Sequence, residues 1–84
     1  MSPLRVKVRF FSVYRDVVEV QGLTILVPER GTVKNLLEEI LRRYPGLNHF
    51  TKNMMFAVNR EFVNGDMKLE DGDEVAIMPP VGGG

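Results

Sequence analysis

The sequence predicts a single α+β domain in which one long helix packs on one face of a mixed β-sheet. Three observations support this fold class. Two strand-like segments precede a segment with clear helical periodicity, and shorter strand-like segments follow it. Glycine, proline, asparagine and aspartate separate these segments, as is typical of turns. The chain has 84 residues, 44% of them hydrophobic, which is enough for one modest core.

The first part of the chain predicts two strands. Residues 4–11 alternate between apolar and basic side chains, except that Phe11 lies on the otherwise polar face. Residues 12–16 are interpreted as a loop or turn, and residues 17–21 as a further loop or the approach to the next strand. The second strand covers residues 23–27 and ends at Pro28.

A helix is predicted from Val33 to Tyr44, with Thr32 placed to cap its N-terminus. Its acidic residues precede its basic residues, so two ion pairs at helical spacing are expected, Glu38–Arg42 and Glu39–Arg43. A Pro-Gly pair ends the helix. The apolar positions recur at steps of three and one: Val33, Leu36, Leu37, Ile40, Leu41 and Tyr44.

The second half of the chain predicts an irregular segment at residues 47–53, with Leu47 and Phe50 folded onto the core. Strands are expected at residues 54–59, 61–63 and 74–78, and turns at 59–60, 64–66 and 71–73. Leu69 is expected to anchor the loop before the last strand. In that strand Met78 lies on the face opposite the apolar pair Val75 and Ile77.

This order of elements is typical of the ubiquitin-like β-grasp, in which the first and last strands are central, adjacent and parallel. The domain is then expected to cover residues 1–78, and residues 79–84 to form an extended C-terminal tail. In this fold Arg5, Lys7 and Arg9 would lie near the acidic residues 71–74.

The composition excludes several functional classes. Eleven basic and eleven acidic residues give no net charge, so neither nucleic acid nor a membrane surface is an expected partner. The chain contains no cysteine and one histidine, His49, interpreted as a loop residue, so no metal site, bound cofactor or independent catalysis is expected. Since no signal peptide or membrane span is recognisable, a cytoplasmic location is expected.

The C-terminal tail is the main functional feature of the sequence. Pro79 and Pro80 lack backbone donors and end the sheet, while the glycines could enter a channel too narrow for side chains. Extended, the six residues would span roughly 20 Å. The α-carboxylate of Gly84 is a poor electrophile, so its use requires activation, most simply by ATP to an acyl-adenylate. An inert, frayed terminus is the alternative.

The chain resembles the small subunits of molybdopterin synthase, the MoaD-type ubiquitin-like sulfur carriers. The resemblance covers nearly the whole chain. It is carried by the sequences Val8-Arg9-Phe10-Phe11, Ala57-Val58-Asn59, Leu69-Glu70-Asp71-Gly72-Asp73-Glu74-Val75-Ala76, Pro79-Pro80-Val81 and Gly83-Gly84.

The resemblance implies that a ubiquitin-activator-like enzyme adenylates Gly84 with ATP, and that sulfur then replaces AMP to give a thiocarboxylate. The tail would enter the large synthase subunit and donate sulfur to a pterin precursor in molybdenum or tungsten cofactor synthesis. Gly83, next to the reacting residue, has no side chain and would therefore let the end of the chain pass. The other expected site residues are the insertion segment Pro79, Pro80, Val81 and Gly82, and the apolar partner-binding residues Phe11, Phe62 and Met78.

Two other functions share this fold and an activated C-terminus. One is a protein modifier joined through Gly84 to lysines of its targets. The other is a sulfur carrier for thiamine synthesis or tRNA thiolation. The two prolines before Val81 and the full-length helix favour the molybdopterin branch.

Overall fold

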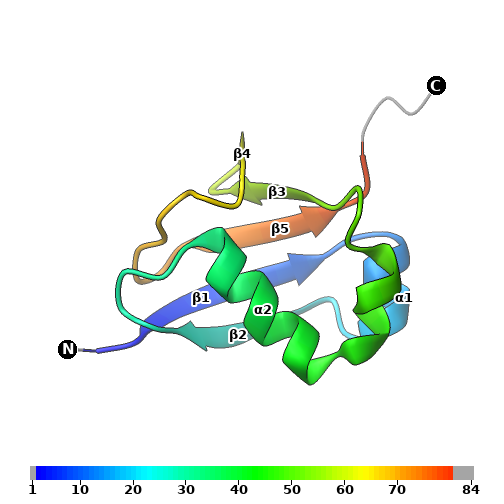
Figure 1. The fold of residues 1–84 in the computed structure, drawn as a ribbon, viewed down its shortest axis with the longest axis horizontal. Coiled ribbons are helices and arrows are strands. Elements are labelled where there is room, and N and C mark those ends of the chain that lie inside the picture. Colours follow the sequence, from blue (N-terminus) through cyan, green and yellow to red (C-terminus); the bar gives the residue numbers. More distant parts are fainter. Residues whose placement is uncertain (1, 81–84) are drawn as a thin grey trace.

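Five strands form one mixed sheet in the order β2-β1-β5-β3-β4 (Figure 1). The computed structural model describes residues 2–80, and the strands are β1 (Leu4–Phe10), β2 (Gly22–Val27), β3 (Met55–Val58), β4 (Glu61–Val63) and β5 (Glu74–Met78). β1 and β5 are parallel neighbours, whereas the other three pairs are antiparallel. The predicted pairing of the first and last strands is confirmed, and with it the β-grasp fold.

Two predicted strands are slightly shorter than expected. The first ends at Phe10, because Phe11 leaves the ladder while its N–H still donates to the Ile77 carbonyl at 3.1 Å. The third runs from Met55 to Val58, and the next two residues make the turn into β4. Asn59 and Arg60 have φ of 50° and 74°, values typical of the tight turns of β-hairpins.

The turn before β5 is held beside β1 by main-chain N–H groups of β1. The Arg5 N–H donates to Asp71 Oδ1 at 2.7 Å, and the Lys7 N–H donates to the Asp73 carbonyl at 2.9 Å. The predicted proximity of these basic and acidic segments is confirmed. In both contacts the basic residue donates through its main-chain N–H and not through its charged side chain.

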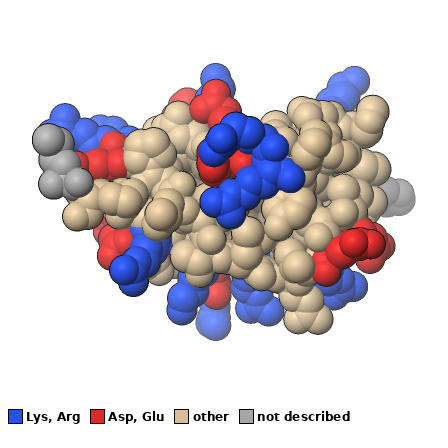
Figure 2. Space-filling model, turned by 90° about the horizontal axis from the view of Figure 1, so that it is seen from below, with Lys and Arg blue, Asp and Glu red and all other residues tan. Residues whose placement is uncertain are grey.

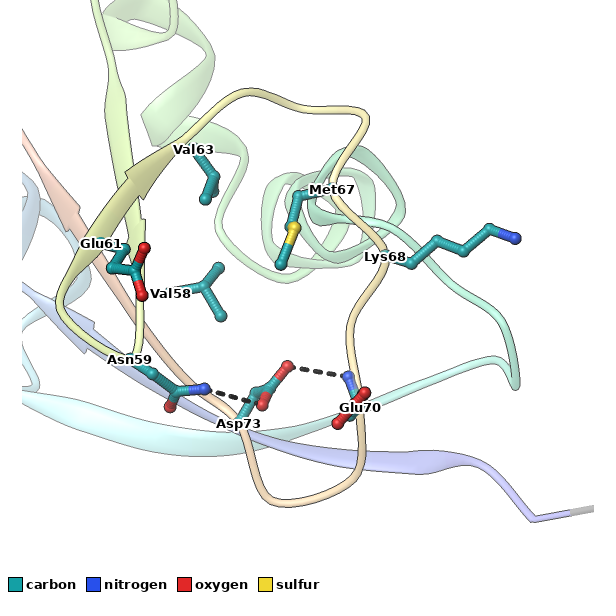
Figure 3. A pocket seen from close by; sticks show the side chains of 8 residues that line it. All are labelled: Val58, Asn59, Glu61, Val63, Met67, Lys68, Glu70 and Asp73. Carbon is teal, nitrogen blue, oxygen red and sulfur yellow. Dashed lines mark hydrogen bonds between the residues drawn. The ribbon is translucent and has the colours of Figure 1, made fainter.

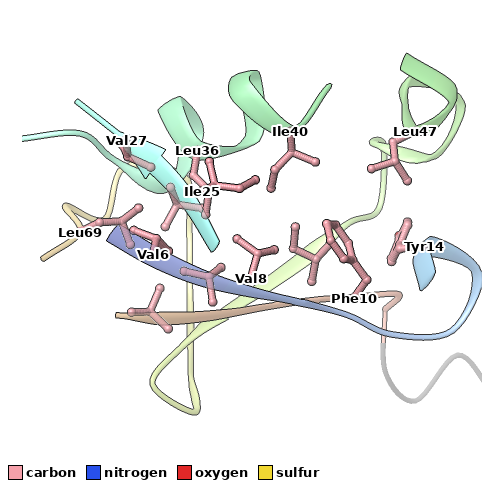
Figure 4. Close-up of a cluster of buried hydrophobic side chains, with 14 of the residues drawn as sticks. Val6, Val8, Phe10, Tyr14, Ile25, Val27, Leu36, Ile40, Leu47 and Leu69 are labelled. Atoms are coloured by element: carbon pink, nitrogen blue, oxygen red, sulfur yellow. The ribbon is translucent and has the colours of Figure 1, made fainter. Parts of the chain in front are cut away.

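The hydrophobic core fills the space between one sheet face and the helix α2 (Val33–Arg43), as Figure 4 shows. Alternation places every second residue of β1 on this face, where Val6, Val8 and Phe10 are at most 2% exposed. Leu36 and Ile40 of α2 are fully buried opposite them. No helix of residues 2–80 covers the opposite face of the sheet, and we call it the open face (Figure 1).

α2 begins as predicted, with a reciprocal cap. The Asn35 N–H donates to Thr32 Oγ1 at 3.3 Å, and the Thr32 N–H donates to Asn35 Oδ1 at 2.9 Å. Its ion pairs differ partly from the prediction, because Glu39 pairs with both Arg42 and Arg43. The expected Glu38–Arg42 pair is wrong: the Asn35 amide donates instead to Glu38, at 3.3 Å.

A short helix, α1 (Val13–Val18), occupies part of the segment that was expected to be a loop. Its two buried residues, Tyr14 and Val18, are four apart, which puts them on one helical face. Six residues are too few for that spacing to repeat, so the sequence pattern did not identify the helix.

The segment expected to be irregular after α2 contains a 3₁₀-helix, η1 (Pro45–Phe50). His49 therefore lies in η1 and not in a loop. Leu47 is fully buried, as predicted, but Phe50 is 38% exposed, so its predicted place in the core is wrong. Leu69 is buried and anchors the loop before β5, as expected. In residues 2–80 no helix is long and apolar enough to cross a membrane.

Candidate functional site

The candidate site comprises the C-terminal tail and the surface from which it starts. β5 ends at Met78, and Pro79 and Pro80 follow it, the first half-buried and the second exposed. The remaining predicted tail residues, Val81, Gly82, Gly83 and Gly84, lie outside the described residues. Their predicted roles in insertion and sulfur transfer stay predictions.

Sheet register brings the three predicted partner-binding residues to one place on the open face. Phe10 pairs with Ile77 across the parallel β1–β5 ladder, so the next residues, Phe11 and Met78, are neighbours. Phe62 pairs with Ala57 of β3, which in turn pairs with Ala76 of β5. Since Ala76 and Met78 are two residues apart, they share a face of β5.

Phe11, Phe62 and Met78 line a shallow hollow of about 290 Å³, which we call the docking hollow. The two alanines, Ala57 and Ala76, also line it, and their small side chains leave room between the larger residues. Phe62 is 56% exposed, Phe11 is 37% exposed and Met78 is half-buried. An exposed apolar surface of this kind is typical of a protein-binding site.

Charged side chains also line the docking hollow. They are Arg9 of β1, Arg60 of the β3–β4 turn and Glu74 of β5. The Arg9 guanidinium lies over the ring of Phe11, 5.6 Å from its centroid. None of these three was predicted as a site residue from the sequence. Alternation in β1 indicated only that Arg9 and Phe11 share a face, and the place of Arg60 depends on the turn.

A hydrogen-bond network fixes the β3–β4 hairpin relative to the start of β5. Asn59 Nδ2 donates to Asp73 Oδ1 at 2.9 Å, and the Glu74 N–H donates to Asn59 Oδ1 at 3.1 Å. The Glu70 N–H donates to the other Asp73 oxygen at 2.8 Å (Figure 3). Phe62 belongs to this hairpin, so the network helps to fix the position of Phe62 relative to β5.

The network lies beside a second hollow of about 200 Å³ (Figure 3). Both carboxylate oxygens of Asp73 accept hydrogen bonds within the protein, which assigns this residue a structural role. In residues 2–80 no group of three histidine, aspartate or glutamate side chains is placed to hold a metal ion.

Comparison with known proteins identifies the family. The ThiS family matches residues 8–84, nearly the whole chain. This chain belongs to the ThiS family. Two curated relatives are both named molybdopterin synthase sulfur carrier subunit. The one from Homo sapiens is 39% identical and the alignment covers 100% of both chains. The one from Chlamydomonas reinhardtii is 37% identical, over 96% of this chain and 100% of the relative.

Solved structures agree with this assignment. The ThiS-family chain is 32% identical to a Pyrococcus furiosus protein assigned as subunit 1 of a molybdopterin converting factor, with a TM-score of 0.85 over 93% of this chain and 99% of the other. A chain from the complex of subunits 1 and 2 of the molybdopterin-converting factor of Helicobacter pylori is similar too (29% identity, TM-score 0.67, 96% and 100% coverage). Small archaeal modifier protein 1 of Haloferax volcanii shares the fold at 20% identity (TM-score 0.85, 93% and 99% coverage).

Proposed function

We propose that this protein is the sulfur carrier and small subunit of a molybdopterin synthase. The observation that carries the proposal is the extent of the similarity to sulfur carrier subunits. The alignment with the human relative covers both chains completely, and the family match runs to residue 84, so both include the terminal glycines. The docking hollow, directly beside the start of the tail, is the expected contact surface for the large subunit.

The chemistry assigned to the chain is carried by one group, the α-carboxylate of Gly84. A ubiquitin-activator-like enzyme joins this carboxylate to the AMP moiety of ATP, with release of pyrophosphate. Sulfur then displaces AMP and leaves a thiocarboxylate on Gly84. In the large subunit, that sulfur is transferred to the pterin precursor, and water supplies the oxygen that restores the Gly84 carboxylate. Gly83 has no side chain, which allows the reacting end to enter a narrow channel.

The chain itself contains few side chains that could catalyse activation or sulfur transfer. It has no cysteine, and its single histidine lies in η1 and is exposed. Activation and transfer therefore depend on groups supplied by the adenylating enzyme and the large subunit. The protein contributes the acyl end and a surface that determines which partners receive it.

The test is reconstitution of the full chain with its adenylating enzyme, ATP and sulfide, followed by intact-mass measurement. The expected product has one oxygen replaced by sulfur, mapped to Gly84. Adding the large subunit and pterin precursor should return the original mass as sulfur leaves. The matched control lacks Gly83 and Gly84. It should melt like the full chain, because terminal residues generally contribute little stability, but should never gain sulfur.

The alternatives give different products in the same assay. A protein modifier would appear as tail remnants linked to lysines of other proteins. A carrier for thiamine synthesis or tRNA thiolation would gain sulfur on Gly84 but would not pass it to the pterin precursor with the large subunit. The archaeal modifier supports the first alternative only through a common fold, at 20% identity.

A further inference from the structure

Two arginine side chains, Arg9 and Arg60, line the docking hollow beside its apolar residues, and we call them the basic rim. Arg9 approaches the hollow from β1, and Arg60 approaches it from the β3–β4 turn on the other side of β5. Both side chains are exposed. Between residues 2 and 80, ion pairs involve only Glu39 with Arg42 and Arg43, so neither rim arginine forms an ion pair with a described carboxylate.

The Arg9 side chain also makes a contact within the hollow. Its guanidinium lies over the Phe11 ring, with Cζ 5.6 Å from the ring centroid, and this cation–π contact favours one position of the side chain. A carboxylate approaching the hollow could accept two parallel hydrogen bonds from the planar guanidinium fork. Less side-chain entropy would be lost on binding, because the contact with Phe11 already restricts the arginine.

The positive charge extends beyond the rim. Arg5 and Lys7 share the open face with Arg9, because successive odd residues of β1 point the same way. Glu74 is the carboxylate that lines the docking hollow, and in the β1–β5 register it is opposite Lys7. Figure 2 shows basic side chains projecting along the lower edge of that view, although the chain as a whole has no net charge.

We propose that Arg9 and Arg60 are specificity residues that bind carboxylates on the large synthase subunit while an apolar side chain of that subunit enters the docking hollow. This inference rests on the proposed function. The occupant follows from two arguments. The basic rim is complementary to an acidic surface. The hollow is also continuous with the start of the tail at Met78, so a protein that receives the tail must approach this face.

The test measures the Kd between the full chain and its own large subunit at about 0.05 M and about 0.5 M NaCl, because salt weakens exposed charge pairs. Arg9→Gln and Arg60→Gln should each weaken binding about tenfold at low salt, the lower end of effects seen for close charge pairs at interfaces. The difference should shrink at high salt. Arg9→Lys and Arg60→Lys should restore part of the affinity.

Arg5→Gln is the matched control. It removes the same charge from the same face of the same strand, but Arg5 does not line the docking hollow. Four residues of strand separate it from Arg9, about 13 Å, which is close to the screening length at about 0.05 M salt and about three times that length at about 0.5 M. Its Kd should change less than twofold. Melting curves by circular dichroism verify that every variant is folded.

Glu74→Gln tests the sign of the partner's charge. If the partner presents carboxylates, removing the one acidic group of the hollow should tighten binding. Weaker binding by Glu74→Gln would indicate a basic partner surface and overturn the proposal. Equal effects of the three arginine substitutions, or none, would overturn it too. A wild-type chain that failed to bind the large subunit at all would instead contradict the proposed function.

Discussion

Phe62 offers the sharpest test of the docking hollow, because most of its surface is still exposed in the free protein. A phenylalanine side chain presents about 200 Å² of surface, and 56% of Phe62 is exposed. About 110 Å² is therefore available to a partner. At about 25 cal/mol per Å², burying it would contribute about 2.8 kcal/mol. Because alanine keeps the Cβ, we expect Phe62→Ala to lose about 2 kcal/mol, or roughly 30-fold in Kd.

The assay is calorimetric titration of the variant with the large subunit, alongside urea unfolding of the free domain. Phe62 lies on the edge strand β4, so the free energy of unfolding should fall by less than about 1 kcal/mol. Leu26→Ala is the control. Leu26 is 53% exposed and pairs with Arg5, which places it on the same open face but on the opposite edge strand, β2.

Three results would refute this reasoning. Phe62→Ala could bind as tightly as the wild type, which would show that the hollow stays empty in the complex. Leu26→Ala could lose as much affinity, which would indicate a general apolar attraction to the open face. Finally, Phe62→Ala could unfold the domain, in which case Phe62 stabilises the fold and is not reserved for a partner.

Three further outcomes are expected. Met78→Lys should weaken binding to the large subunit and leave the domain folded, because Met78 lies on the open face; unfolding would instead place it in the core. Leu36→Ala should lower the free energy of unfolding by about 3 kcal/mol in urea titrations, since Leu36 is fully buried. Glu39→Gln should destabilise the protein at neutral pH but not in acid. The Arg42 hydrogen bond, with attraction from Arg42 and Arg43, lowers the pKa of Glu39. Its stabilising effect is thus present above the unfolded-state pKa and is lost as the pH falls through the folded-state pKa.

The elements that could be predicted from the sequence are those in which a local pattern repeats. β1 alternates over its whole length, and α2 has a cap at Thr32, a continuous apolar face and a terminating Pro-Gly pair. In these segments propensity, patterning and turn chemistry all favour the same structure. The parallel pairing of β1 with β5 followed from the order of the elements.

The errors occurred where tertiary contacts override a short pattern. α1 has less than two turns, and only two buried positions indicate its helical face. Phe50 is apolar but lies in η1, where its carbonyl accepts a 3.5 Å hydrogen bond from the Tyr14 hydroxyl while its side chain remains exposed. Hydrophobicity alone does not determine which side of a 3₁₀-helix faces the core.

The candidate site shows the same limit. The off-face positions of Phe11 and Met78 were readable from strand alternation, so the apolar part of the hollow could be predicted. Arg60 could not, because its position depends on a turn with positive φ and on the hydrogen bonds of Asn59 to Asp73 and to Glu74 at the start of β5. Arg9 was visible as a residue of the polar face. Its placement over Phe11 is a property of the folded side chains.

β5 connects the docking hollow to the tail, because it contributes residues to the hollow and leads directly into the tail. β5 is held on both sides, by β1 in parallel and by β3 in antiparallel, and the fully buried Ile77 anchors its end. Met78, which lines the hollow, is followed immediately by Pro79, which is stiff and already half-buried. A partner seated on the hollow therefore meets the start of the tail at a fixed position. For a chain whose proposed chemistry depends on one terminal carboxylate, this fixed geometry is how the folded domain can direct that group into a partner's active site.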